Sequence, residues 1–127
     1  MPALDRLHGV RVVADPGSLD RATWHGDEVS VLRFAPDDAF GVGATGVDID
    51  DEHAIVEDEV GFVGAWLDPA EIEPHIEWSL PTARPALAQG SIAGVPAKLW
   101  LPVDGDALLL AAAAYGDELT RRLGSRR

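Results

Sequence analysis

The sequence predicts an α+β protein: a single domain in which a mixed or mostly antiparallel sheet of six to eight strands is accompanied by two or three helices. Three observations predict this class. Short apolar segments recur along all 127 residues without the regular strand–helix alternation of a parallel sheet. Asp104-Gly105 lies between two apolar runs, which is the pattern of a hairpin turn. The segment from Ala111 to Leu123 is rich in Ala, Leu and Glu and ends in basic residues before Gly124, as expected for a C-terminal helix packed on the sheet.

In the first half of the chain the patterns predict strands with a helical turn between them. A run of β-branched residues ended by Asp15-Pro16-Gly17 indicates a strand, and the alternation before Pro36 indicates another. Pro36 and the two acids after it favour a helix start, because proline suits the first turn and acidic side chains interact favourably with the helix dipole. The expected elements are a loose lead-in over residues 1–8, strands over 9–14 and 28–34, a helical turn over 18–24, and a Gly-rich segment over 40–49, interpreted as a bulged strand with close backbone approach.

The second half contains the clearest boundaries. Asp68-Pro69 is a good helix start, with Asp as the N-cap and Pro in the first position, and Ile72, Ile76 and Leu80 follow as one apolar stripe. The expected elements are strands over 54–56 and 60–67 with a bend at Asp58-Glu59, a helix from 68 to 80, strands over 86–93 and 95–101 broken at Gly94, and a frayed tail over 124–127.

Negative charge is concentrated in the middle of the chain. Residues 34–83 contain thirteen acidic side chains and no Lys or Arg, whereas the remaining residues have nine acids and ten bases. The formal net charge of −12 therefore belongs to this window. Clustered like charge weakens a compact state through self-repulsion, so a cation, a basic partner or simple solvation must make it tolerable.

Composition limits the classes of function that we consider. The chain has no cysteine, which excludes disulfides, thiolate metal sites and a cysteine nucleophile. Its acidity argues against nucleic acid or a membrane surface as a partner, because both are bound largely through Lys and Arg. No positive-then-apolar leader opens the chain and no apolar run is long enough to span a bilayer, so we expect a cytoplasmic protein. The bias towards Ala, Arg and Asp suggests a bacterial source.

The acidic segment from Asp48 to Glu59 is the best candidate for a cation site. Its crowded carboxylates are hard oxygen ligands, and their spacing resembles that of an EF-hand calcium loop. However, His53 stands where the sharp turn needs glycine, and the Gly-rich stretch before the segment forbids the preceding helix. We therefore interpret the segment as a solvated acidic turn and predict no metal ligand and no cofactor.

No pattern typical of a catalytic centre is found in the sequence. Glu71 and His75 would share a helix face, where they could hold a metal or tune a general base, but a surface ion pair explains this spacing more simply. The serines lack the G-x-S-x-G setting of a nucleophile elbow. Carboxylates are abundant, but acid–base catalysis needs one of them to be buried. We predict no catalytic residue.

The contact residues that we predict are Glu57, Asp58, Glu59 and Trp78. The three acids are consecutive in the charged window, where an acidic face could attract a basic partner. Trp78 would share the helix of residues 68–80 at a different angle from the apolar stripe, so we expect it to be partly exposed. An exposed aromatic side chain beside acids is a suitable contact for a protein partner.

The C-terminal quarter of the chain resembles a known family. From Gly90 to Leu123 a strand is followed by G-V-P, K-L-W-L, D-G-D, A-L-L-L, A-A-Y and D-E-L-T-R-R-L. This order is similar to the closing part of domains in the folate-dependent aminomethyltransferase superfamily, especially the gamma subunit of heterotetrameric sarcosine oxidase, in which an L-L-x-x-x-x-x-Y-x-x-x-L run forms a strand and then a helix. The resemblance transfers no ligand-binding residue, and it implies a non-catalytic accessory subunit.

These observations favour a small non-catalytic accessory or partner-binding protein whose acidic contact face lies in residues 34–83. The expected partner is a protein, preferably a basic one, and neither nucleic acid nor a membrane. Two alternatives stay open: a module that binds a divalent metal or a small solute, and a small enzyme. We also consider a homodimer, because the terminal strands of a sheet leave edges to be covered.

Overall fold

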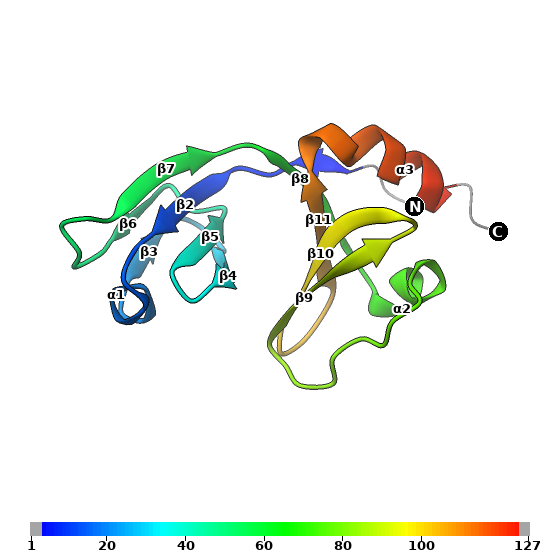
Figure 1. Ribbon diagram of the computed structural model, residues 1–127, viewed down its shortest axis with the longest axis horizontal. Helices are drawn as coiled ribbons and strands as arrows, with labels where there is room; N and C mark the ends of the chain where they lie inside the picture. The colour runs from blue at the N-terminus through cyan, green and yellow to red at the C-terminus, as the bar shows by residue number, and fades with distance from the viewer. Residues whose placement is uncertain (1–3, 125–127) are drawn as a thin grey trace. The chain divides into compact units, whose positions relative to one another are not determined.

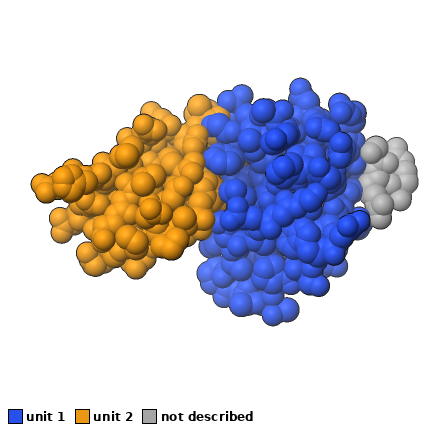
Figure 2. Space-filling view, in the orientation of Figure 1, with its two compact units in different colours: residues 1–6, 61–127 blue, residues 7–60 orange. Residues whose placement is uncertain are grey.

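The computed structural model describes residues 4–124 and divides the chain into two compact units (Figure 2). Unit 1 consists of residues 1–6 and 61–127, and unit 2 consists of residues 7–60. Antiparallel sheets dominate both units and a helix lies at the C-terminal end, which confirms the α+β class. The expectation of a single domain stays a prediction, because a compact unit need not fold by itself.

Unit 2 is built on a four-stranded antiparallel sheet with the strand order β4–β5–β2–β7 (Figure 1). β-branched and other apolar side chains alternate along β2, as expected for a strand with one face in the core. The unit is completed by a short helix and by a separate pair of strands. The bounds are β2 Gly9–Val13, α1 Pro16–Asp20, β3 Thr23–His25, β4 Ser30–Ala35, β5 Asp38–Val42, β6 Gly46–Asp48 and β7 Ile55–Glu59.

One face of this sheet forms the core of unit 2. Val12 of β2, Ala39 of β5 and Leu19 of α1 are buried together, and Trp24 of β3 packs against them. Gly41 of β5 lets the indole approach the sheet, since a Cβ at this position would lie 2.4 Å from Trp24 Cε3. This contact confirms the close backbone approach expected for the Gly-rich segment.

Unit 1 is built on a five-stranded antiparallel sheet with the strand order β1–β8–β11–β10–β9 (Figure 1). Two hairpins connect β9 to β10 and β10 to β11. The first has the two-residue turn Ala93-Gly94, with φ values of 52° and 79°, and the second turns through Asp104-Gly105. The bounds are β1 Asp5–Arg6, β8 Phe62–Leu67, α2 Pro69–Ile72, η1 Glu73–His75, β9 Ala86–Ile92, β10 Val95–Leu101, β11 Ala107–Ala112, η2 Ala113–Tyr115 and α3 Gly116–Gly124.

The core of unit 1 lies between this sheet and the segments that cover one of its faces. Leu99 of β10 and Leu109 of β11 are fully buried, together with Leu119 of α3 and Ile72 of α2. Leu123 of α3 is buried in the same cluster. The two leucines of α3 are four residues apart and therefore lie on the same side of the helix. Their burial confirms that the C-terminal helix packs on the sheet.

The strand count and several element bounds differ from the expectations. Residues 4–124 contain eleven strands in three sheets rather than six to eight strands in one, and three α-helices. The bend expected at Asp58-Glu59 is displaced to Val60-Gly61, because Glu59 still pairs with Gly9 of β2. Asp5–Arg6 form strand β1 within the expected lead-in. Of the expected frayed tail, residues 125–127 lie outside the described residues.

Two predicted helix starts are wrong. Pro36 and Asp37 form the turn between β4 and β5, where the carbonyl oxygen of Asp37 accepts a hydrogen bond from the backbone N–H of Ala14 at 3.0 Å. The C-terminal helix begins at Gly116 instead of Ala111, because β11 continues through Ala112 and pairs with β8 up to Phe62. In both places the tertiary pairing of strands prevails over a weak local preference.

The helix that begins at Asp68-Pro69 is shorter than predicted. Asp68 caps it, with its Oδ1 accepting the N–H of Ala70 at 2.9 Å, and Glu71 Oε1 accepts the N–H of Asp68 at 3.2 Å. The α-helix ends at Ile72 and a 3₁₀ turn follows, because Pro74 lacks a backbone N–H and its ring disrupts the α-helical ladder. The N-cap prediction is therefore confirmed, whereas the length is wrong.

The negative charge belongs almost entirely to unit 2. Residues 7–60 contain thirteen acids and three arginines, a net charge of −10, whereas unit 1 has nine acids and seven bases, a net charge of −2. The charged window of residues 34–83 thus extends over both units. Most of its acidic residues belong to unit 2, the smaller of the two.

Candidate functional site: the exposed strand β7 and a pocket of unit 1

Strand β7 is the most exposed regular element of unit 2. It is an edge strand of its sheet, and in the described part of the chain only β2 pairs with it. Ile55 and Val56 within the strand are 56% and 48% exposed, Val60 just beyond it is 47% exposed, and Val13, the register partner of Ile55, is 39% exposed. These four side chains are the large apolar side chains that unit 2, which is described in full, leaves exposed to solvent.

The three predicted contact acids all lie on β7, but they are not equivalent. Side chains alternate between the faces of a strand, so Glu57 and Glu59 share one face and Asp58 lies on the other. Glu57 and Asp58 are exposed. Glu59 is half-buried, and its Oε1 accepts a hydrogen bond from Arg11 Nη1 at 2.8 Å. The Glu59 side chain therefore links β7 to β2, and the side chains of Glu57 and Asp58 are exposed to solvent.

Arg11 of β2 links the two neighbouring strands. Its Nε and Nη2 atoms donate to the two carboxylate oxygens of Asp38 on β5 at 2.6 and 2.7 Å, while Nη1 binds Glu59 on β7. The guanidinium also lies 4.7 Å from the ring centroid of Phe34. The hydrogen bonds to Asp38 raise the pKa of Arg11 above its ordinary value, against the opposing effect of burial. The arginine stays charged at every practical pH.

Trp78, the fourth predicted contact residue, lies in unit 1 and not on a helix. It is half-buried, packs against the core of unit 1, and its Nε1 donates to the carbonyl oxygen of Ser91 at 3.0 Å. Trp66 of β8 is the more exposed tryptophan, at 47%. The structure therefore gives Trp78 a packing role in unit 1, whereas the three acids belong to unit 2.

The acidic turn before β7 has an internal structural role. Asp51 Oδ2 accepts the backbone N–H of Asp15 at 2.8 Å, and its Oδ1 accepts that of His53 at 2.9 Å. Ser18 Oγ donates to the carbonyl oxygen of Asp50 at 2.9 Å. These bonds fasten the turn to the start of α1. Among the described residues, no group of three or more His, Asp or Glu side chains is arranged to hold a metal ion.

Replacing Asp51 with Asn should lower the stability of the protein at neutral pH. The two backbone N–H groups lower the pKa of Asp51 below its ordinary value of 3.8, so the folded state favours the ionised carboxylate. Its stabilising effect is complete above about pH 5 and is lost as the pH falls through the lowered pKa. Thermal unfolding should therefore show a lower Tm for Asp51→Asn at pH 7 and a smaller difference from wild type near pH 3.

The matched control is Asp50→Asn, which removes the same charge from the same turn. In the described part of the chain, Asp50 accepts the hydrogen bond of Ser18 through its backbone carbonyl oxygen, which the substitution retains. Equal Tm changes for the two variants at pH 7 would contradict the proposed role of the Asp51 side chain.

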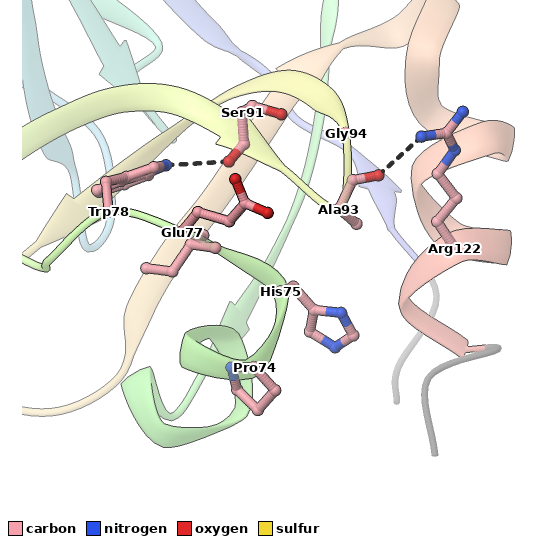
Figure 3. A pocket seen from close by; sticks show the side chains of 9 residues that line it. Pro74, His75, Glu77, Trp78, Ser91, Ala93, Gly94 and Arg122 are labelled. Atoms are coloured by element: carbon pink, nitrogen blue, oxygen red, sulfur yellow. Dashed lines mark hydrogen bonds between the residues drawn. The ribbon is translucent and has the colours of Figure 1, made fainter.

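Unit 1 contains a pocket of about 600 Å³ beside the segment that follows α2 (Figure 3). Its strongest donors are already engaged. Arg122 of α3 donates from Nη1 to the carbonyl oxygen of Ala93 at 2.9 Å and from Nη2 to Glu118 Oε1 at 2.6 Å, and Trp78 donates to Ser91. The residues that line the pocket come from three short segments: Pro74, His75, Ile76, Glu77 and Trp78, then Ser91, Ala93 and Gly94, then Arg122.

Sequence reasoning missed the exposed valine and isoleucine side chains on β7. The segment 54–56 was expected to be an apolar strand, and apolar strands are usually placed in the core. Three consecutive acids follow at once, and in a strand consecutive side chains face both sides. This was the available signal that neither face of β7 could be buried.

Comparison of the chain with protein-family models, with curated proteins and with solved structures finds no match. The resemblance of the C-terminal quarter to the gamma subunit of sarcosine oxidase therefore stays a prediction. Among residues 4–124, none of the helices combines the length and the apolar character needed to cross a membrane.

Proposed function

We propose that this protein is a non-catalytic accessory protein that binds a basic protein partner through strand β7 of unit 2. The observation that supports this most directly is the exposure of Ile55 and Val56 on an acidic edge strand. Ile55 lies beside Val13 on one face of the sheet, and Val56 lies on the other face. Exposed apolar side chains bordered by charge are characteristic of interaction sites. The apolar pair supplies contact area, and the neighbouring acids select a partner of opposite charge.

The charge of unit 2 supports a basic partner rather than a second copy of the chain. Two copies joined through β7 would place Glu57 and Asp58 of one copy near the same acids of the other. Like charges on adjacent strands are destabilising. A partner with Lys or Arg near these positions would instead be attracted by the net charge of −10, which also speeds the encounter.

The experiment is affinity isolation from the native source, with wild-type protein and the double variant Glu57→Gln/Asp58→Asn as baits. We expect wild type to recover a basic protein and the double variant to recover several-fold less of it. With the purified partner, the association rate should fall in the double variant at low salt. The association rates of wild type and the double variant should become equal as the salt concentration rises, because screening removes the long-range attraction.

The matched control is Asp104→Asn/Asp106→Asn, which removes two exposed acids from a turn of unit 1. This variant should behave like wild type, since its charges lie outside the acidic unit. Equal losses in both double variants would indicate a nonspecific charge effect. Recovery of no specific protein by wild type would contradict the proposed function.

A further inference from the structure

Two backbone hydrogen bonds at the ends of β2 determine which backbone groups of β7 point away from the sheet. The N–H of Gly43 donates to the carbonyl oxygen of His8 at 2.8 Å, and the N–H of Ala14 donates to that of Asp37 at 3.0 Å. Both bonds flank the pairing of β2 with β5. They show that the even-numbered residues of β2 direct their backbone N–H and C=O groups towards β5.

The odd-numbered residues of β2 consequently direct theirs towards β7, because backbone polar groups alternate along an antiparallel ladder. In the register, Arg11 is opposite Glu57 and Val13 is opposite Ile55. Glu57 and Ile55 therefore bond to β2. Val56 lies between these two residues and Asp58 follows Glu57. Both direct their N–H and C=O groups away from β2, along the outer edge of the sheet.

This outer edge is a template for a further strand. Backbone donors and acceptors in a row can be satisfied by water or by another extended chain, and natural proteins usually protect such edges. Here the edge has charged side chains as protection, but it also has two β-branched apolar side chains that add contact area. Addition of a strand to a sheet edge is an established mode of peptide recognition.

Resting on the proposed function, we propose that the partner binds as an extended segment that adds a fifth strand beside β7. In antiparallel pairing, the segment meets Asp58 and Glu57 first and then Val56 and Ile55. Two basic residues followed by two β-branched apolar residues therefore match the edge on both faces. The occupant is a basic-then-apolar protein segment, held by backbone hydrogen bonds to Val56 and Asp58 and selected by side chains.

Amide hydrogen exchange of the full chain, followed by NMR, tests the edge directly. In the free protein the Glu57 amide should exchange more slowly than those of Val56 and Asp58. The probe is a capped synthetic peptide, Thr-Lys-Arg-Val-Ile-Thr. At saturation it should slow exchange at Val56 and Asp58 at least tenfold. A peptide with Asp and Glu in place of Lys and Arg should have no effect.

Two substitutions at one position separate backbone pairing from side-chain attraction. Asp58→Pro removes the outward N–H, and proline is tolerated at such a position on an edge strand. Asp58→Asn removes the charge but keeps the N–H. We expect the proline variant to lose peptide binding and the asparagine variant to bind only a few-fold more weakly. Retained protection of Glu57 shows that β7 is still formed in each variant.

Several results would overturn this inference. Equal weakening by Asp58→Pro and Asp58→Asn would mean that side chains alone hold the partner. Absence of protection in wild type at millimolar peptide would exclude the fifth strand without the use of any variant. Protection of Val56 and Asp58 that rises with protein concentration in the absence of peptide would identify a second copy as the occupant.

The outcomes also distinguish this inference from the proposed function. If affinity isolation yields a basic partner that still binds Asp58→Pro, the proposed function stands and strand addition fails. If the peptide protects both amides but no partner is isolated, the edge is competent and the proposed function fails.

Discussion

Replacing Gly9 with Ala is expected to destabilise the protein by about 3 kcal/mol, the largest effect that we predict for a single methyl group. A Cβ at Gly9 would lie 2.1 Å from the carbonyl oxygen of Gly41 and 2.8 Å from Phe40 Cε1. The obstructing oxygen belongs to the backbone of β5, which cannot turn aside as a flexible side chain could. The sheet of unit 2 must therefore separate locally between β2 and β5.

Urea denaturation of Gly9→Ala and Gly46→Ala tests this expectation. Apart from its two chain neighbours, a Cβ at Gly46 would have no atom of the described chain within 4 Å, so the second variant controls for the loss of glycine itself. The free energy of unfolding of Gly46→Ala should lie within about 0.5 kcal/mol of the wild-type value, as is usual for unhindered surface substitutions. Similar midpoints for the two variants would show that β2 and β5 are not paired in this register.

Replacing Arg11 with Met is expected to destabilise the protein by about 2 kcal/mol. The substitution keeps an apolar stem near Phe34 but removes the charged hydrogen bonds to Asp38 and Glu59. Those carboxylates would remain on one face of the sheet without their shared cation. The expected value is below that of a fully buried ion pair, because the Arg11 side chain is 28% exposed and water screens part of the interaction.

Two further variants control this experiment. Arg11→Lys keeps the charge but cannot bind Asp38 through two parallel bonds, so it should lose about half as much stability. Arg33→Met breaks the ion pair with Asp20, in which the Asp20 side chain is 66% exposed, and it should cost less than about 1 kcal/mol. Chemical denaturation that ranks Arg33→Met at or above Arg11→Met would contradict the central role of Arg11.

Most local features of the fold could be predicted from short segments of the sequence. Asp68-Pro69 starts a helix because the Asp side chain and the missing proline N–H suit the first turn wherever they occur. The β-branched run of β2 and the turn at Asp104-Gly105 are likewise local preferences. These are the features for which expectation and structure agree.

The candidate site could be predicted only in part. Three consecutive acids identified Glu57 and Asp58 as solvent-exposed, since neither face of such a strand is easily buried. The pattern could not show that Glu59 pairs with Arg11, because the two residues are 48 positions apart and Arg11 lies in an unremarkable strand. Nor could it assign Trp78 to the wall of a pocket, which depends on the position of β9.

The sequence by itself determined the α+β class, the turns at Gly94 and Asp104-Gly105, the strand periodicities and the concentration of negative charge. The tertiary structure alone decided the length of β11, the order of the strands, and hence which strand lies at the end of the sheet of unit 2. Ala111 and Ala112 have no strong preference for a strand and adopt one because they pair with β8. Strand order has the same origin: pairing partners distant in sequence are chosen by how all strands bury their apolar faces together, and no local pattern contains that information.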